Sequence, residues 1–564
     1  MAFFLSNEYT QLEVFAKSTQ NAVGRVRLTG LEGEEIQEAG TENFRWLKYR
    51  LKKGGRYDLE TEECSISLAY LSGNQAAFED GIVFLEQKEG EWQPIGKKEL
   101  ASFNDHPSRE QYHFTPFKNW MNDPNGLCWY KGYYHMFYQY NPHSQIWHNM
   151  YWGHAVSRDL IHWRHLPVVL EPQKEILEDK EKKGGAFSGS AWVEEEKVVF
   201  YLTRHLSRWD NECIKKQYQV MMESGDMLHF TEEKIVIDGP PNPDISHNFR
   251  DPKLFTDPVT KEICMVLGSC EKGIPAVLLY RSRDMMNWKY QGPLLLERTP
   301  GILTFECPDA FFLDGYFVVL GAWMEHTDEQ GRYQMTRCYV GRLEEGTMVM
   351  EKESWFDFGS NCYAVQSFEK DGKRIAVGWI SDFYQEYTSA GDGPKGSMSI
   401  PRILSVKNGS LYMEPIPQIY NQMRECLGKA WEDNLSIEIP QGGNSYYAKV
   451  VLKEHSSAIF RLLLAKGEGS RLWLLSDGKS VRIFTEGTKT EGISFSAEVK
   501  VREIEIFMDR RVAEVYVNQG QAAGTKIFCC DRTDTIFQTD FEDTEEVKSV
   551  EVYKMESVWA IKEH

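Results

Sequence analysis

A turn pattern that recurs three times in the middle of the chain constrains the fold more than any other feature. The pattern is Ser-x-Asp-x-x-x-aromatic, and its copies begin at Ser157, Ser224 and Ser282, 67 and 58 residues apart. Each copy follows a run of strand-forming residues, namely YWGHAV, YQVMME and AVLLYR. An equivalent turn after an equivalent strand, at periods of this length, is typical of the four-stranded blades of a β-propeller. The alternative is three unrelated turns, since Ser and Asp are common in turns.

The sequence on both sides of the repeat predicts further β structure. Residues 1–105 alternate short strand-like runs with Gly-containing turns, and the polar segment 97–109 is expected to be a linker. A second break precedes a helical-looking stretch at residues 418–431, beyond which apolar residues alternate with the period of two of half-buried strands. We expect an all-β chain whose domains span residues 1–105, 106–415 and 416–564, the last being a linker and a β-sandwich.

Length and composition restrict the class of protein. A chain of 564 residues exceeds what one hydrophobic core usually supports, so two to four domains are expected. The net charge of −20 disfavours nucleic acid and anionic membranes as partners. The first ten residues lack a secretory signal, and the eleven cysteines lack metal-binding spacing, so a cytoplasmic protein with reduced thiols is expected. The composition does not determine the oligomeric state, and a homo-oligomer is compatible with it.

Three acidic motifs are spaced in register with the repeat. Asp123 lies in the stiff turn WMNDPNG and precedes Ser157 by 34 residues, whereas Asp251, in RDP, precedes Ser282 by 31. Glu306, in ECP, follows Ser282 by 24 residues and falls early in the next blade. The first strand of each blade lines the central channel of a propeller. The three acids are therefore expected to meet in one axial pocket.

Rigidly held carboxylates without a metal are typical of glycoside hydrolysis. Taken singly, each acid also has a structural interpretation, because turn aspartates and paired acids are common. Glu306 is unusual because it stands in an otherwise apolar strand, and burial favours the protonated acid that a proton donor requires. The histidines show no metal-ligand spacing, and no glycine-rich loop could cradle a phosphate, so neither a metal nor another cofactor is predicted.

Together, the ordered motifs resemble glycoside hydrolase family 32, the β-fructosidase family that contains invertases, exo-inulinases and levanases. The resemblance covers residues 110–564, approximately, and leaves residues 1–105 outside. The motifs are WMNDPNG (120–126), QYNP (139–142), WGHAVSRDLIHW (152–163), FSGS (187–190), FRDPK (249–253), ECPD (306–309), YAVQSF (363–368), PRIL (401–404) and IFMDRRVAEVYVN (506–518).

The resemblance implies a five-bladed propeller followed by a β-sandwich, and hydrolysis with retention of configuration. It implies that Asp123 is the nucleophile, Glu306 the acid/base and Asp251 the group that holds fructose hydroxyls. The two carboxyl groups of a retaining pair should stand about 5–5.5 Å apart. The residues implied to bind the terminal fructose are Asn122, Gln139, Trp147, Phe187, Ser188, Arg250, Tyr363 and Trp379.

The predicted function is the release of terminal non-reducing β-D-fructofuranosyl units from fructo-oligosaccharides, fructans or sucrose-like disaccharides. A sucrose-6-phosphate hydrolase or a fructosyltransferase with the same site is the near alternative. A pentosidase of a related family and a non-catalytic carbohydrate-binding protein are remoter ones. Phe305 replaces a common family Trp, and Asn361-Cys362 replaces a common Asp-Phe, which leaves the preferred leaving group open.

Overall fold

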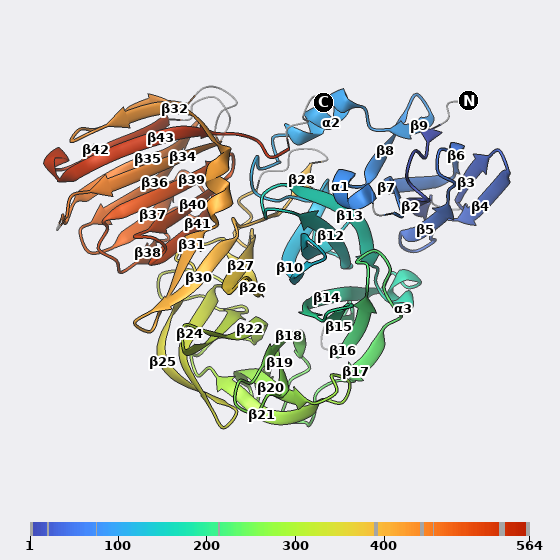
Figure 1. Ribbon diagram of the computed structural model, residues 1–564, viewed down its shortest axis with the longest axis horizontal. Helices are drawn as coiled ribbons and strands as arrows, with labels where there is room; N and C mark the ends of the chain where they lie inside the picture. The colour runs from blue at the N-terminus through green and yellow to red at the C-terminus, as the bar shows by residue number, and fades with distance from the viewer. Residues whose placement is uncertain are drawn as a thin grey trace.

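The protein is almost entirely β structure and contains three groups of sheets. The computed structural model describes residues 4–19, 22–74, 76–211, 215–387, 393–439, 445–454, 456–529 and 536–559. The strands in these ranges form nine sheets, and Figure 1 shows a ring of sheets with one further group on each side. The prediction of an all-β propeller and sandwich chain is confirmed. No helix in the described ranges is long and apolar enough to cross a membrane.

Two sheets formed by residues 4–94, here called the N-terminal sheets, share one core. Apolar residues on alternate positions of neighbouring strands, such as Val14 and Leu28, fill the space between them. One sheet has the order β1 (Phe4–Leu5), β6 (Arg56–Glu62), β3 (Arg25–Gly30), β4 (Gly33–Glu38). The other has the order β5 (Arg45–Arg50), β2 (Gln11–Ser18), β7 (Cys64–Ser72), β8 (Val83–Lys88), β9 (Glu91–Pro94), with α1 (Ala76–Asp80) between β7 and β8.

Five sheets between residues 119 and 415 form the ring. The first contains β10 (Asn119–Tyr130), β11 (Tyr133–Asn141), β12 (Tyr151–Ser157) and β13 (Trp163–Leu170). After α3 (Lys174–Leu177), the second contains β14 (Lys182–Val193), β15 (Val198–Arg208), β16 (Lys216–Ser224) and β17 (Lys234–Ile237). The next two are β18 (Arg250–Thr256), β19 (Ile263–Glu271), β20 (Ile274–Ser282), β21 (Lys289–Leu296) and β22 (Phe305–Leu313), β23 (Tyr316–Trp323), β24 (Thr336–Glu344), β25 (Thr347–Trp355). The last comprises β26 (Tyr363–Lys370), β27 (Lys373–Ile380), β29 (Ser397–Met398), β30 (Arg402–Lys407) and β31 (Ser410–Pro415).

The first strands of these sheets face the centre of the ring. Each of β10, β14, β18 and β22 contacts the next first strand, and β26 contacts β10 again (Figure 1). A short strand from the last part of the ring, β28 (Pro394–Lys395), pairs in parallel with β10 and links the two ends. Side chains from first strands of different sheets can therefore meet around one axis.

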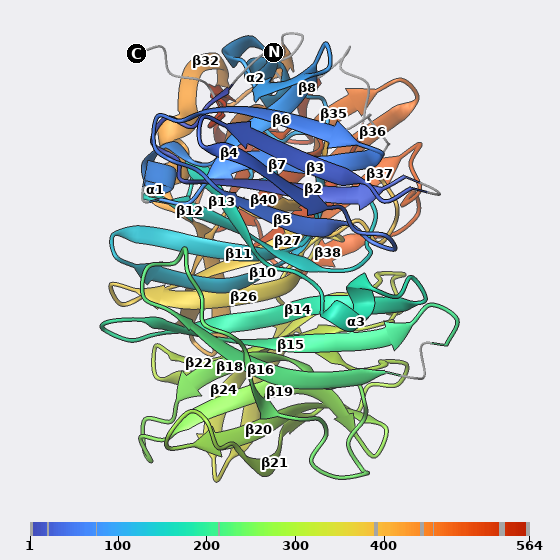
Figure 2. The same ribbon diagram turned by 90° about the vertical axis from the view of Figure 1, so that its right-hand side faces the viewer.

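Two six-stranded sheets after residue 422 form the sandwich. One has the order β32 (Met423–Ala430), β43 (Val547–Met555), β34 (Ser445–Leu452), β39 (Glu503–Asp509), β40 (Val512–Val517), β41 (Ala522–Ile527). The other has the order β33 (Ser436–Glu438), β42 (Ile536–Phe541), β35 (Ile459–Gly467), β36 (Ser470–Asp477), β37 (Val481–Glu486), β38 (Phe495–Ala497), and η2 (Thr544–Glu546) precedes β43. Figures 1 and 2 show the sandwich and the N-terminal sheets on opposite sides of the first and last sheets of the ring.

The recurring turn has the same structure in all three copies. It joins the third strand of a sheet to the fourth, and the serine Oγ accepts the N–H of the residue three positions on, at 2.9, 2.8 and 2.9 Å. That residue has a positive φ each time: 69° at Leu160, 64° at Met227 and 62° at Met285. The aspartate Oδ1 accepts the next two N–H groups in every copy. These matching contacts exclude three unrelated turns.

Two connecting segments have a secondary structure that differs from the expected one. The polar segment expected to be a linker contains helix α2 (Lys97–Asn104). Its last residue, Asn104, donates from Nδ2 to the carbonyl of Trp559 at 2.8 Å, and Phe103 stacks on Phe117. The stretch expected to be helical begins with the short helix η1 (Pro417–Gln422), but the strand β32 follows it directly. Contacts between distant parts of the chain therefore decide both segments.

Candidate active site

A pocket of about 470 Å³ lies at the inner strands of the ring and gathers the predicted site residues. The three acids Asp123, Asp251 and Glu306 all line it. Of the eight predicted substrate-binding residues, seven line it as well, namely Asn122, Gln139, Trp147, Phe187, Arg250, Tyr363 and Trp379. The eighth, Ser188, is fully buried directly behind Asp123. The structure therefore brings residues of distant motifs together in one pocket, as expected.

An irregularity in each first strand turns the site residues toward the pocket. The pairing register shifts in every one of these strands at an equivalent place, and the shifted segments contain all three acids; β10 has a second shift, between Asn125 and Cys128. A bulge of this kind interrupts the alternation of side chains and re-aims one of them. Asp251, Cys307 and Ala364 within these segments have positive φ of 65°, 46° and 51°. The shifts lie at 121–124, 186–189, 250–253, 306–309 and 363–366.

Asp123 is surrounded by uncharged hydrogen-bond donors. Its Oδ2 accepts from Ser188 Oγ at 2.5 Å, from Gln139 Nε2 at 3.2 Å and from Cys307 Sγ at 3.4 Å. Among the described residues, its Oδ1 accepts one hydrogen bond, from Asn122 Nδ2 at 3.0 Å. Burial raises the pKa of Asp123, the hydrogen bond from Ser188 acts in the opposite direction, and the charge of Glu306 raises the pKa further.

Glu306 is held instead by a cation and a phenol. Arg250 Nη2 donates to Oε1 at 2.9 Å, and the Tyr363 hydroxyl donates to Oε2 at 2.6 Å. The Glu306 side chain is 21% exposed and lines the pocket. Asn248 Oδ1 accepts from Nη1 of the same guanidinium at 3.1 Å and so orients it.

Asp251 is held by backbone hydrogen bonds, and its pKa is affected by the charges of both other acids. Its Oδ2 accepts the backbone N–H of Cys307 at 2.7 Å, and its own N–H donates to Thr203 Oγ1 at 2.9 Å. Burial raises the pKa of Asp251 to about 7, although the charge of Arg250 opposes this, and Glu306 and Asp123 raise it. Negative charge on Glu306 and Asp123 therefore disfavours ionisation of Asp251.

The sequence did not predict the outer wall of the pocket. One part comes from the second sheet and the segments before β16 and β18, namely Lys183, His205, Ser207, Lys215, Gln217 and Asn248. The other part comes from β10 and from segments next to the fourth and fifth sheets, namely Trp120, Met324, Gln334, Asp382 and Phe383. Trp120 lies in the first motif, and its Nε1 donates to Asn122 Oδ1 at 2.8 Å, so the motif itself could have indicated it. The others belong to no motif.

The residues that depart from the family pattern lie next to Glu306 and Tyr363 in the chain but do not line the pocket themselves. Phe305, Asn361 and Cys362 are all buried and none lines the pocket. Asn361 Nδ2 donates to the carbonyl of Ser381 at 2.7 Å, and its Oδ1 accepts the N–H of Ile527 in the sandwich at 2.9 Å. Asn361 therefore ties the sandwich to the segment before Asp382, and it does not face a leaving group directly.

Comparisons with known proteins agree with this geometry. Residues 113–415, more than half of the chain, match the family model described as the glycosyl hydrolases family 32 N-terminal domain. A sucrose-6-phosphate hydrolase of Zymomonas mobilis is 31% identical over 73% of this chain and 84% of its own length. A levanase of Bacillus subtilis is 28% identical over 81% of this chain and 72% of its own length.

A solved structure extends the likeness to the N-terminal sheets. The glycoside hydrolase family 32 protein of Bifidobacterium adolescentis is 30% identical, with a TM-score of 0.90 over 99% of this chain and 100% of the other. Residues 1–105, for which the sequence motifs gave no resemblance, therefore have a counterpart in that structure. The ring, the pocket and the match over residues 113–415 place the chain in one family: it belongs to glycoside hydrolase family 32.

Proposed function

We propose that the protein is a retaining exo-acting β-fructofuranosidase, which releases terminal β-D-fructofuranosyl units from fructo-oligosaccharides, fructans or sucrose-like disaccharides. The observation that carries the proposal is the pair of differently held acids, Asp123 and Glu306, that line one pocket. Retaining hydrolysis needs one carboxylate free to attack and one carboxyl group that can give and take a proton. The names of the relatives, sucrose-6-phosphate hydrolase and levanase, support fructosides as substrates.

In the proposed mechanism Asp123 attacks the anomeric carbon through Oδ1. Oδ2 already accepts three hydrogen bonds, whereas Oδ1 accepts one and is the freer oxygen. Glu306 gives its proton to the leaving oxygen as the glycosidic bond breaks. It then removes a proton from the water that releases fructose from Asp123. The Tyr363 hydroxyl can donate to the ionised carboxylate or accept from the protonated acid, so one contact serves both steps.

Closure of the far end of the ring supports action at chain ends. Lys253, two residues beyond Asp251 in β18, reaches across to the carbonyl of Ser367 in β26 and stands 3.5 Å from Asp309 in β22. Lys253 and Asp309 are buried, so this ion pair fills the space between three sheets. A pocket open at one end accepts a terminal sugar and excludes the middle of a chain.

Product analysis tests the proposed function. The purified protein is incubated with sucrose, 1-kestose, inulin and levan, and the products are separated with time. We expect fructose as the first product, without internal fragments. Release of oligosaccharides from inulin or levan, or no fructose from any of these substrates, contradicts the proposal.

Hydrolysis of sucrose 6-phosphate is a second candidate function that a specific observation favours. Lys183 and Lys215 line the outer pocket of a chain whose net charge is −20, and Lys215 Nζ donates to Asn248 Oδ1 at 2.8 Å. Lysine is a common partner of phosphate. If the pocket takes a phosphorylated leaving group, Lys183→Met and Lys215→Met lower kcat/KM for sucrose 6-phosphate and leave that for sucrose unchanged. Equal losses on both substrates exclude phosphate recognition by these lysines.

A further inference from the structure

One segment of the pocket rim reaches out of the ring and contacts the N-terminal sheets. Residues 142–148, here called the Trp147 segment, lie in the connection from β11 to β12, and Trp147 lines the pocket beside Phe187 and Lys183. At the other end of the segment, the ring of His143 stacks on Phe44 with centroids 4.2 Å apart and planes at 11°. Its Nδ1 shares a hydrogen bond of 2.8 Å with Ser67 Oγ. His143 thus joins the pocket rim to β7 and to the segment before β5.

Hydrogen bonds hold the Trp147 segment in place between these two ends. Asn141 Oδ1 accepts the N–H of His143 at 3.0 Å, and Asn141 Nδ2 donates to Ser144 Oγ and to the carbonyl of Ile146, both at 2.9 Å. The N–H of Trp120 donates to the carbonyl of Ser144 at 3.0 Å. A displacement of His143 is therefore passed along the segment to Trp147, because the intervening backbone is fixed by hydrogen bonds.

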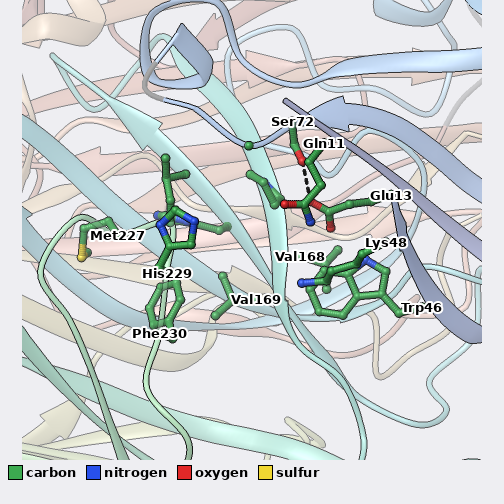
Figure 3. A pocket seen from close by; sticks show the side chains of 14 residues that line it. Gln11, Glu13, Trp46, Lys48, Ser72, Val168, Val169, Met227, His229 and Phe230 are labelled. Carbon is green, nitrogen blue, oxygen red and sulfur yellow. Dashed lines mark hydrogen bonds between the residues drawn. The ribbon is translucent and has the colours of Figure 1, made fainter. Parts of the chain in front are cut away.

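The N-terminal sheets are themselves fixed to the ring at other points, so they can act as a support. Val156 and Leu166 of the first sheet belong to the same core as the N-terminal sheets. The Tyr70 hydroxyl donates to Glu13 Oε2 at 2.9 Å and accepts the N–H of Val168 at 3.0 Å. Figure 3 shows Glu13 facing the strand that carries Val168 and Val169, with Ser72 bonded to the same carboxylate.

We infer that His143 is a positioning residue through which the N-terminal sheets fix Trp147 at the mouth of the pocket. The inference rests on the proposed function and assigns to residues 4–94 a part in substrate binding without contact to the substrate. Burial keeps the pKa of His143 well below its usual range, and the charges of His148, Lys17 and Lys118 act in the same direction. The ring is therefore neutral, and its support of the segment consists of stacking and one hydrogen bond.

Steady-state kinetics on a fructoside that the wild-type protein hydrolyses tests this inference. In His143→Ala we expect KM to rise about tenfold while kcat stays within about twofold, because misplacement of a binding group weakens substrate affinity more than it affects the reacting acids. Ser67→Ala removes only the hydrogen bond, and KM should rise about threefold. His143→Phe keeps the stacked ring and should restore much of the affinity lost in His143→Ala.

Tyr49→Phe is the matched control. It removes a buried hydroxyl that donates to the carbonyl of Val26 within the N-terminal sheets but leaves their contacts with the ring and the Trp147 segment untouched, so KM should not change. An unchanged KM in His143→Ala overturns the inference, and so does an equal rise of KM in Tyr49→Phe. If His143→Ala does not fold, Ser67→Ala decides alone. A wild-type protein that releases no fructose overturns the proposed function instead, so the two failures are distinguishable.

Discussion

The two reactive acids of the pocket are held in opposite ways. The donors around Asp123, here called the Asp123 cradle, are neutral groups from Asn122, Gln139, Ser188 and Cys307. The groups on Glu306, here called the Glu306 clamp, are the guanidinium of Arg250 and the hydroxyl of Tyr363. A neutral cradle orients a carboxylate without cancelling its charge, whereas a clamp with a cation holds a group whose charge changes during the reaction. The difference teaches that position in the ring brings the acids together, and that their neighbours give them separate roles.

The largest expected effect is the loss of Asp123. Asp123→Ala should lower kcat by about 10⁴-fold or more, because it removes the carboxylate that forms the covalent intermediate. The melting temperature should stay close to that of the wild type, because the change relieves the burial of a charge. Fructose release and thermal unfolding measure the two effects. A fall below tenfold would transfer the role of nucleophile to another group.

Replacement of Glu306 should have the next largest effect, and one that depends on the leaving group. Glu306→Gln should lower kcat on sucrose by about 10³-fold, because the amide cannot protonate the leaving oxygen. With fructosyl fluoride, whose leaving group needs no proton, the first step should recover. Equal losses on both substrates contradict the assignment of Glu306 as the proton donor.

Removal of one hydroxyl from the Asp123 cradle and one from the Glu306 clamp sharpens the comparison of the two acids. Ser188→Ala and Tyr363→Phe should each lower kcat about tenfold, because each removes one short hydrogen bond to a reacting carboxyl group. The loss in Tyr363→Phe should grow as the leaving group becomes more basic, whereas the loss in Ser188→Ala should not vary. A plot of kcat against leaving-group pKa for both variants checks this. Parallel lines would show that the cradle and the clamp do not act on different steps.

The smallest expected effect is the pH dependence of fructose binding. The pKa of Asp251 is raised to about 7, so the group is ionised above that pH and protonated below it. If the ionised group accepts hydrogen bonds from sugar hydroxyls, the inhibition constant of fructose should rise several-fold as the pH falls from about 8 to about 6. In Asp251→Asn the inhibition constant of fructose should be higher than in the wild type and should not change between these pH values. A pH dependence that persists in Asp251→Asn assigns the titration to another group.

The sequence predicted the features that local residue types determine. The recurring turn needs Ser, Asp and a left-handed residue at fixed places, and the acids lie in stiff motifs in register with it. The outer pocket wall could not be predicted, because residues such as His205 and Gln217 reach it only through the pairing of β15 with β16. Helix α2 has a polar sequence without apolar period and depends on contacts with Trp559 and Phe117. The contact of His143 with Phe44 joins regions that no motif relates.

The central claim is that Asp123 carries the fructosyl group between the two steps, and trapping that intermediate tests it most directly. Glu306→Gln is mixed with fructosyl fluoride, quenched in acid and digested, and the peptides are examined by mass spectrometry. The account predicts one added fructosyl group, on the peptide that contains β10 and on Asp123 within it. A fructosyl group on the peptide that contains Asp251, or free fructose formed in a burst without any labelled peptide, contradicts it.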